Sequence, residues 1–116
     1  MNILFLYEFG GYDEVAGLRL VGHEVDSVST AKWAYEKLLE KKYEAIIIHG
    51  SDDMPVKDGR CLSKLVQDEF PETIRICYTG EVSQYYRDQF MERFDTVASK
   101  LMGVRGLQAI IERIQK

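Results

Sequence analysis

The sequence lacks the features of a secreted, membrane-bound or nucleic-acid-binding protein. Only two cysteines occur, Cys61 and Cys77, and their spacing fits neither a disulfide framework nor a Cys-x-x-Cys zinc site. No apolar run approaches the roughly 18 residues of a membrane span, and the N-terminus lacks the pattern of a signal peptide. The 15 basic residues are scattered and the net charge is −4, which argues against a nucleic-acid surface. We therefore expect a soluble, cytoplasmic protein that binds neither membranes nor nucleic acids.

Short apolar segments alternate with amphipathic ones along the whole chain. No linker interrupts them, so residues 1–116 are expected to form a single domain. About 46% of the residues are apolar, which is enough to build a hydrophobic core. The expected strands are residues 2–7, 23–29, 43–49, 73–79 and 95–101. The expected helices are residues 10–22, 30–42, 59–70, 82–94 and 104–115.

Several expected strands, such as residues 2–7 and 43–49, are apolar on both faces. This pattern is typical of a parallel sheet covered by helices, and the crossovers that such a sheet needs are right-handed. The sequence therefore predicts an α/β fold, flavodoxin-like, with a single doubly wound five-stranded parallel sheet in the order 2-1-3-4-5 and helices on both faces. The helix at residues 10–22 is the least regular, because Gly17 lies inside it and an internal glycine costs about 1 kcal/mol.

Doubly wound sheets place their sites where the carboxyl ends of the strands meet. Polar residues follow four of the five expected strands. They are Tyr7 and Glu8 after the first strand, His49 to Asp53 after the third, Thr79 after the fourth and Lys100 after the fifth. We expect these side chains to gather at one edge of the sheet.

Five fragments in a fixed order extend over the whole chain: NILFLYE, GHEVDSVSTAKWAYEKLLEKKYEAIII, MPVKDG, ICYTGE and ASKL. They resemble the receiver domains of two-component response regulators, the CheY-like family. The resemblance implies phosphoryl transfer to an aspartate at the tip of the third strand. Two groups would neutralise the negative charge on the transferring phosphoryl group: a Mg²⁺ ion bound by an acidic pair after the first strand, and a lysine after the fifth strand. Thr79 and Lys100 stand at the threonine and lysine positions of this pattern.

The sequence departs from the family pattern at the nucleophile and at the acidic pair. Tyr7 and Glu8 stand where the family has two acids, so that one carboxylate is replaced. Counting back from the Met-Pro turn puts Ser51 at the acceptor position, whereas counting forward along the strand puts His49 there. Neither count yields an aspartate, and a serine hydroxyl needs a base before it can act as a nucleophile.

Asp52 and Asp53 are the nearby carboxylates that could accept a phosphoryl group instead. A slip of one residue along an extended chain reverses the side-chain direction, which disfavours Asp52. Asp53 has the right direction but lies about 7 Å farther on. Either residue would need a rearranged loop. Glu8 and Asp53 are also the candidate ligands for weak Mg²⁺ binding, and no other cofactor is expected.

Two functions stay open. The first is a stand-alone atypical receiver, or pseudo-receiver, that is not an enzyme and signals by phosphorylation-independent binding of other signalling proteins. The alternative is a phosphoacceptor receiver that uses Asp52 or Asp53 with Mg²⁺. A flavodoxin-like small-molecule binder is disfavoured, because the sequence lacks a Ser/Thr/Gly-rich loop after the first strand and the Asp-x-His-x-x-Gly motif of cobalamin binders. If the chain is a pseudo-receiver, the vestigial pocket consists of Glu8, Asp52, Asp53, Thr79 and Lys100.

The helix expected at residues 82–94 carries more aromatic side chains than the sheet needs. One row of apolar side chains along the helix is enough to cover the sheet. Tyr85 and Met91 point away from the centre of that row. In the family, an aromatic residue three positions before the lysine relays the phosphorylation state. That position is Val97 here, and a β-branched valine is stiff at χ1. We predict that the face with Tyr85, Met91 and Val97 mediates homodimerisation or partner docking.

Overall fold

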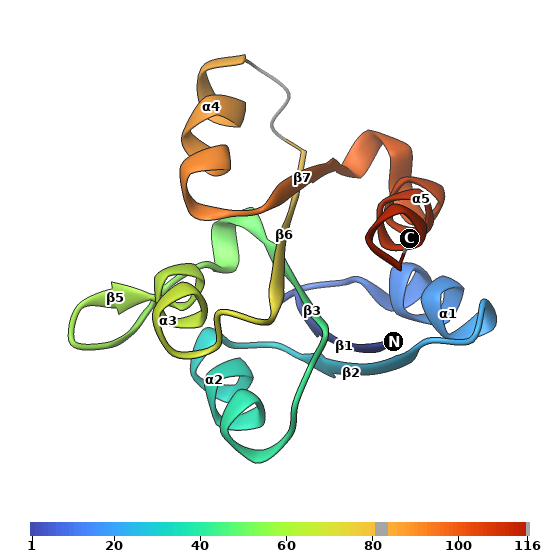
Figure 1. Ribbon diagram of the computed structural model, residues 1–116. Helices are drawn as coiled ribbons and strands as arrows, with labels where there is room; N and C mark the ends of the chain where they lie inside the picture. The colour runs from blue at the N-terminus through green and yellow to red at the C-terminus, as the bar shows by residue number, and fades with distance from the viewer. Residues whose placement is uncertain (81–83, 116) are drawn as a thin grey trace.

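The chain forms a five-stranded parallel sheet between two layers of helices, shown as a computed structural model in Figure 1. The structure describes residues 1–80 and 84–115, and for residues 84–87 and 90 it describes the backbone alone. The sheet consists of β1 (Asn2–Leu6), β2 (Glu24–Val28), β3 (Ala45–His49), β6 (Ile74–Thr79) and β7 (Thr96–Ser99). The order is β2-β1-β3-β6-β7, with every neighbouring pair parallel. Counted along the chain, these strands have the predicted order 2-1-3-4-5, and the predicted fold is confirmed.

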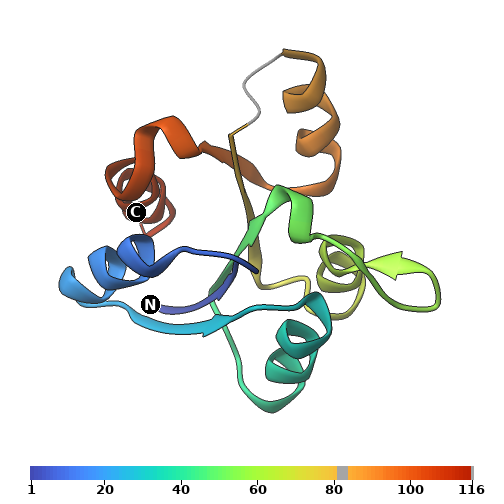
Figure 2. The ribbon, with the colours of Figure 1, turned by 180° about the vertical axis from the view of Figure 1, so that it is seen from behind.

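Helices cover both faces of the sheet. They are α1 (Tyr12–Leu20), α2 (Ala31–Glu40), α3 (Leu62–Glu69), α4 (Gln84–Arg93) and α5 (Gly103–Gln115). Figures 1 and 2 show α1 and α5 side by side on one face and α2 and α3 on the other, while α4 lies near β7. Within residues 1–80 and 84–115, no helix combines the length and the apolar character needed to cross a membrane.

The apolar side chains of the central strands divide between two cores. In β3, Ile46 and Ile48 face α2 and α3, whereas Ala45 and Ile47 face α1 and α5. All four are completely buried, because successive side chains of a strand point to opposite faces and helices cover both faces of this sheet. The helices complete the two cores with Ala34, Leu38, Leu62 and Val66 on one side, and with Val15, Leu18, Leu107 and Ile111 on the other.

A small hairpin between β3 and α3 corrects one sequence prediction. Residues 59–61 were expected to begin a helix, but α3 begins at Leu62. Before it, β4 (Pro55–Lys57) pairs in antiparallel fashion with β5 (Arg60–Cys61). Asp58 and Gly59 form the turn with φ values of 55° and 72°. Asp-Gly is the dipeptide that most readily accepts two successive left-handed conformations, so the chain reverses here before the helix begins.

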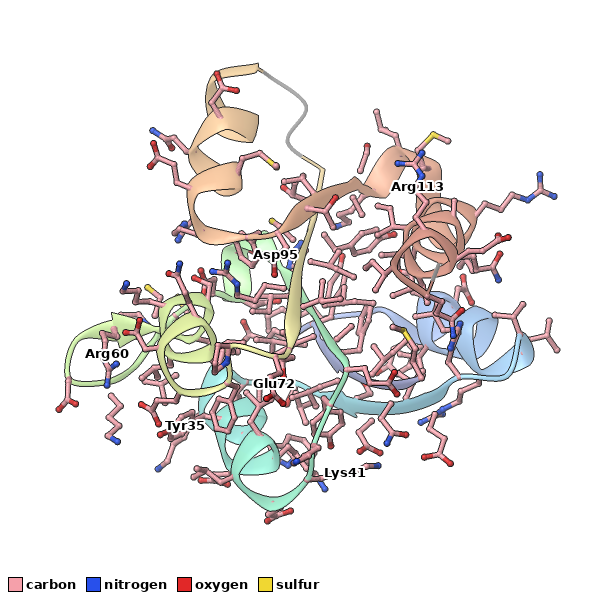
Figure 3. All side chains as sticks on the ribbon, viewed as in Figure 1. Tyr35, Lys41, Arg60, Glu72, Asp95 and Arg113 are labelled. Atoms are coloured by element: carbon pink, nitrogen blue, oxygen red, sulfur yellow. The ribbon has the colours of Figure 1, made fainter. Side chains whose placement is uncertain are left out.

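The Asp26 carboxylate, in the middle of β2, ties this strand to the connection between α2 and β3. The Tyr43 hydroxyl donates to Asp26 Oδ2 at 2.5 Å, and Lys41 Nζ donates to the same oxygen at 3.2 Å. Figure 3 shows Lys41 at the end of α2. The hydrogen bond from Tyr43 is the main reason why the pKa of Asp26 is lowered, with a smaller contribution from Lys41. Burial and the Asp26 carboxylate both raise the pKa of Tyr43.

We expect Tyr43→Phe to lower the free energy of unfolding by about 1 kcal/mol at neutral pH, because it removes a hydrogen bond to a charged, partly exposed group. The folded-state pKa of Asp26 is depressed, so this stabilisation is present above the ordinary pKa of 3.8 and is lost as the pH falls through the lower folded-state value. Urea unfolding at pH 7 and below pH 3.8 should therefore show a difference between the two proteins that shrinks in acid. Tyr12→Phe, at a side chain 84% exposed, is the matched control and should change nothing.

Candidate functional site

Two aromatic rings meet where β1 and β3 end. The Tyr7 ring stacks on the imidazole of His49, with ring centroids 4.1 Å apart and an interplanar angle of 5°. His49 is the last residue of β3 and lies opposite Tyr78 in the register of β3 with β6. Ser51 lies two residues farther on, exposed in the 3₁₀ turn η1 (Gly50–Asp52). The side chain at the tip of β3 is therefore the histidine.

Asp52 fixes the orientation of the His49 imidazole. Asp52 Oδ2 accepts a hydrogen bond from the Glu8 backbone N–H at 2.9 Å and lies 2.9 Å from His49 Nδ1. A carboxylate can only accept hydrogen bonds, so Nδ1 carries a ring hydrogen, and in the neutral imidazole Nε2 presents its lone pair. That lone pair faces Lys100 Nζ at 3.5 Å, and the same ammonium donates to the Tyr7 hydroxyl at 2.5 Å.

The hydrogen on His49 Nδ1 also determines the chemistry of Ser51. The Ser51 hydroxyl lies 3.1 Å from that nitrogen. Because Nδ1 already carries a hydrogen directed at Asp52, it cannot take the serine proton as a general base. The lone pair that could do so is on Nε2, which faces Lys100. This geometry does not activate Ser51 as a nucleophile.

Asp53 binds the N-terminus of α3 and the end of α4. Its Oδ1 accepts the Ser63 backbone N–H at 2.8 Å, and its Oδ2 accepts the Ser63 hydroxyl at 2.6 Å and Arg93 Nη1 at 3.1 Å. Ser63 is in the first turn of α3, whose backbone N–H groups have no partner within the helix. The Asp53 side chain is 1% exposed, so this carboxylate is enclosed by its hydrogen-bond donors.

Thr79 and Lys100 lie at the same edge as the residues that follow β1 and β3. Thr79 ends β6 and lies against Gly50, where an added Cβ would be 3.5 Å from the threonine side chain. Lys100 follows β7 and begins the 3₁₀ turn η2 (Lys100–Met102). The parallel sheet thus brings Glu8, residues 49–53, Thr79 and Lys100 together, as the strand ends lead one to expect.

The oxygen ligands at this edge do not fit the Mg²⁺ ion that the family resemblance implies. Tyr7 occupies one acidic position and holds Lys100, while the Asp53 carboxylate faces Ser63 and Arg93. Among the described residues, no three side chains of histidine, cysteine, aspartate or glutamate are grouped to hold a metal ion. Glu8 and Asp53, the candidate ligands suggested by the sequence, have different surroundings: Glu8 is exposed and Asp53 is buried.

A cavity of about 440 Å³ opens beside the stacked rings. Its lining consists of Tyr7, Glu8, Phe9, His49, Ser51 and Asp52. A larger hollow of about 590 Å³ lies at the opposite edge of the sheet, lined by Tyr43 and Phe70 among others. The smaller cavity contains His49 and Ser51, the two residues that the sequence offers for the acceptor position, and it is therefore the candidate site.

Comparison with solved structures identifies the architecture. No protein-family model matches the sequence, and no curated protein matches it. A response regulator from Desulfuromonas acetoxidans has a TM-score of 0.83 at 18% identity, with 98% of this chain and 95% of that chain covered. The chemotaxis response regulator CheY4 of Vibrio cholerae has a TM-score of 0.81 at 16% identity, with 97% of both chains covered. The receiver domain of Francisella response regulator 1452 gives 0.83 at 16% identity, covering 97% of this chain and 94% of that one.

The fold is that of response-regulator receiver domains. At 16–18% identity, the likeness shows the fold alone. The site therefore has to be described from the residues of this chain. In this receiver fold, β7 ends next to the lysine, and Val97 of β7 is half-buried against the core under α2 and α3. Met91 on α4 is 53% exposed. The side chain of Tyr85 lies outside the described part of the structure, so the predicted partner face stays a prediction.

The link between α4 and the loop after β3 was not predicted from the sequence. Arg93, in the last turn of α4, reaches Asp53 across 40 positions of the chain. Asp95, labelled in Figure 3, then accepts the backbone N–H of Arg75 at 2.8 Å and its guanidinium at 3.3 Å. A pairing so distant in sequence leaves no local pattern that predicts it.

Proposed function

We propose that this chain is a receiver-like signalling domain of the cytoplasm that acts by binding other proteins without being phosphorylated, and that it is not an enzyme. The observation that supports this proposal best is the tip of β3. There His49 stands at the strand end, stacked on Tyr7 and held by Asp52 and Lys100. The lysine that would neutralise a transferring phosphoryl group is bonded to Tyr7 instead.

The alternative, a displaced phosphoacceptor, requires Asp52 or Asp53 to attack a phosphorus atom. Each carboxylate is already engaged, Asp52 by a backbone N–H and an imidazole, and Asp53 by Ser63 and Arg93. Attack would require breaking these hydrogen bonds in a nearly solvent-free position, without the second acid of the metal pair. These costs favour the phosphorylation-independent function.

Incubation with acetyl phosphate and Mg²⁺, followed by intact mass spectrometry, tests the proposal. We expect no phosphoryl adduct on the native chain. His49→Asp alone should stay unlabelled because Tyr7 still replaces half of the acidic pair. Tyr7→Asp combined with His49→Asp supplies both missing carboxylates, and this double variant should gain label if the rest of the pocket is intact. Stoichiometric labelling of the native protein at Asp52 or Asp53 would overturn the proposal.

Beryllofluoride gives a second measurement that does not depend on the lifetime of an acyl phosphate. Two similar solved structures are a DrrB receiver domain activated by BeF₃ and the response regulator TrrA from Thermotoga maritima with Mg²⁺ and beryllofluoride. For this chain we expect neither saturable binding nor a shift of the unfolding temperature when beryllofluoride and Mg²⁺ are added together.

A further inference from the structure

The cavity after β1 and β3 is lined by π faces and hydrogen-bond acceptors. Tyr7, Phe9 and His49 contribute the rings, Glu8 and Asp52 the carboxylates, and Ser51 a hydroxyl. Among the residues whose side chains the structure describes, no lysine or arginine is part of this lining. Lys100 donates to the Tyr7 hydroxyl and lies 3.5 Å from His49 Nε2, so it contacts the stacked rings, which also line the cavity. Arg93 donates to Asp53, which is not part of the lining.

Glu8 and Phe9 differ from the rest of this lining because, within the part of the chain that the structure describes, no ion pair or ring contact engages their side chains. Asp52 Oδ2 is engaged by the Glu8 backbone N–H and the His49 imidazole, whereas the exposed Glu8 side chain has no cationic partner among the described residues. Phe9, the next residue, holds its ring 85% exposed. An uncompensated carboxylate next to an exposed aromatic ring is the pair of groups that recognises an organic cation.

We propose that this cavity receives the guanidinium group of an arginine side chain displayed by a partner protein. A guanidinium is planar and weakly hydrated, so it can stack on Phe9 while its N–H fork pairs with the Glu8 carboxylate. The ammonium of a lysine is more strongly hydrated and cannot pair in the same way, and a Mg²⁺ ion would need more oxygen ligands than this cavity offers. This inference rests on the proposed function and adds to it the chemistry of the partner.

Titration of the isotope-labelled protein with N-acetyl-arginine amide tests the inference. We expect saturable changes in the backbone amide resonances of residues 7–10 in the millimolar range, and much smaller changes with N-acetyl-citrulline amide, which has the same shape without the charge. Glu8→Gln should weaken binding of the arginine probe about three- to fivefold, and Phe9→Leu, which keeps apolar bulk without a π face, by a similar factor. Glu36→Gln removes another exposed carboxylate, on α2, and should leave binding unchanged.

Equal responses to arginine and citrulline probes would overturn the inference, as would an affinity for the arginine probe that Glu8→Gln leaves unchanged. Saturable changes at residues 7–10 with Mg²⁺ but not with the arginine probe would also overturn it in favour of a metal site. Circular dichroism of each variant ensures that the fold is retained. The proposed function is tested separately, because uptake of a phosphoryl group by the native chain would contradict it whatever the arginine probe does. A native chain that takes up none and also ignores the arginine probe would contradict the cavity assignment alone.

Discussion

Replacing Asp53 with alanine is expected to lower the free energy of unfolding by about 3 kcal/mol. The substitution removes the acceptor of three hydrogen bonds, and the carboxylate that makes them is 1% exposed. Ser63 N–H at the start of α3 would be left without a partner in a buried position. The Arg93 side chain is 42% exposed and can turn to water, so the cost falls short of that for a fully enclosed ion pair.

Urea unfolding followed by circular dichroism measures this change, with Glu36→Ala as the control at an exposed carboxylate. Arg93→Ala and the double variant with Asp53→Ala complete a cycle that isolates the contribution of the ion pair. We expect Arg93→Ala to cost about 1 kcal/mol, because Asp53 keeps both of its bonds to Ser63. A loss below about 1 kcal/mol for Asp53→Ala would mean that this carboxylate is solvated and free for other chemistry.

The sheet could be predicted from the sequence because its signals are local. Each β-branched strand is separated from the next by an amphipathic segment, and Ile46 and Ile48 alternate with Ala45 and Ile47 as the two covered faces require. Parallel strands then place their carboxyl ends at one edge without further information. The general location of the candidate site follows from that topology, before any side chain is positioned.

The detailed chemistry of the site could not be predicted in the same way. The stacking of Tyr7 on His49 depends on the spacing of two strands that are far apart in sequence. The Glu8 backbone N–H holds Asp52 in place, and Asp52 in turn orients the imidazole. The contact with Glu8 depends on backbone geometry and so leaves no residue signature. The Asp58-Gly59 dipeptide indicates a turn, but the sequence does not show that the hairpin around this turn delays the start of α3 until Leu62.

The close approach of α1 and α5 explains the glycine that made the first helix irregular in sequence. A Cβ atom built on Gly17 would lie 2.2 Å from Val104 Cγ1, far inside any real contact. The backbone oxygen of Gly17 also accepts a hydrogen bond from Gln108 Nε2 at 3.1 Å. Figure 2 shows the two helices side by side. Glycine is required here by the approach of α5, although it weakens the helix that contains it.

Gly17→Ala is therefore expected to destabilise the fold, against the prediction from helix propensity. Alanine gains about 1 kcal/mol in a helix interior, but overpacking against a stiff valine costs about 1–3 kcal/mol, and we expect a net loss of up to about 2 kcal/mol. Val104→Ala should relieve the clash, so that Gly17→Ala becomes neutral or stabilising in that background. Urea unfolding of the four proteins measures this reversal of sign. If Gly17→Ala stabilises the native background as well, α1 and α5 are not packed closely enough for a methyl group to separate them, and propensity alone determines the effect.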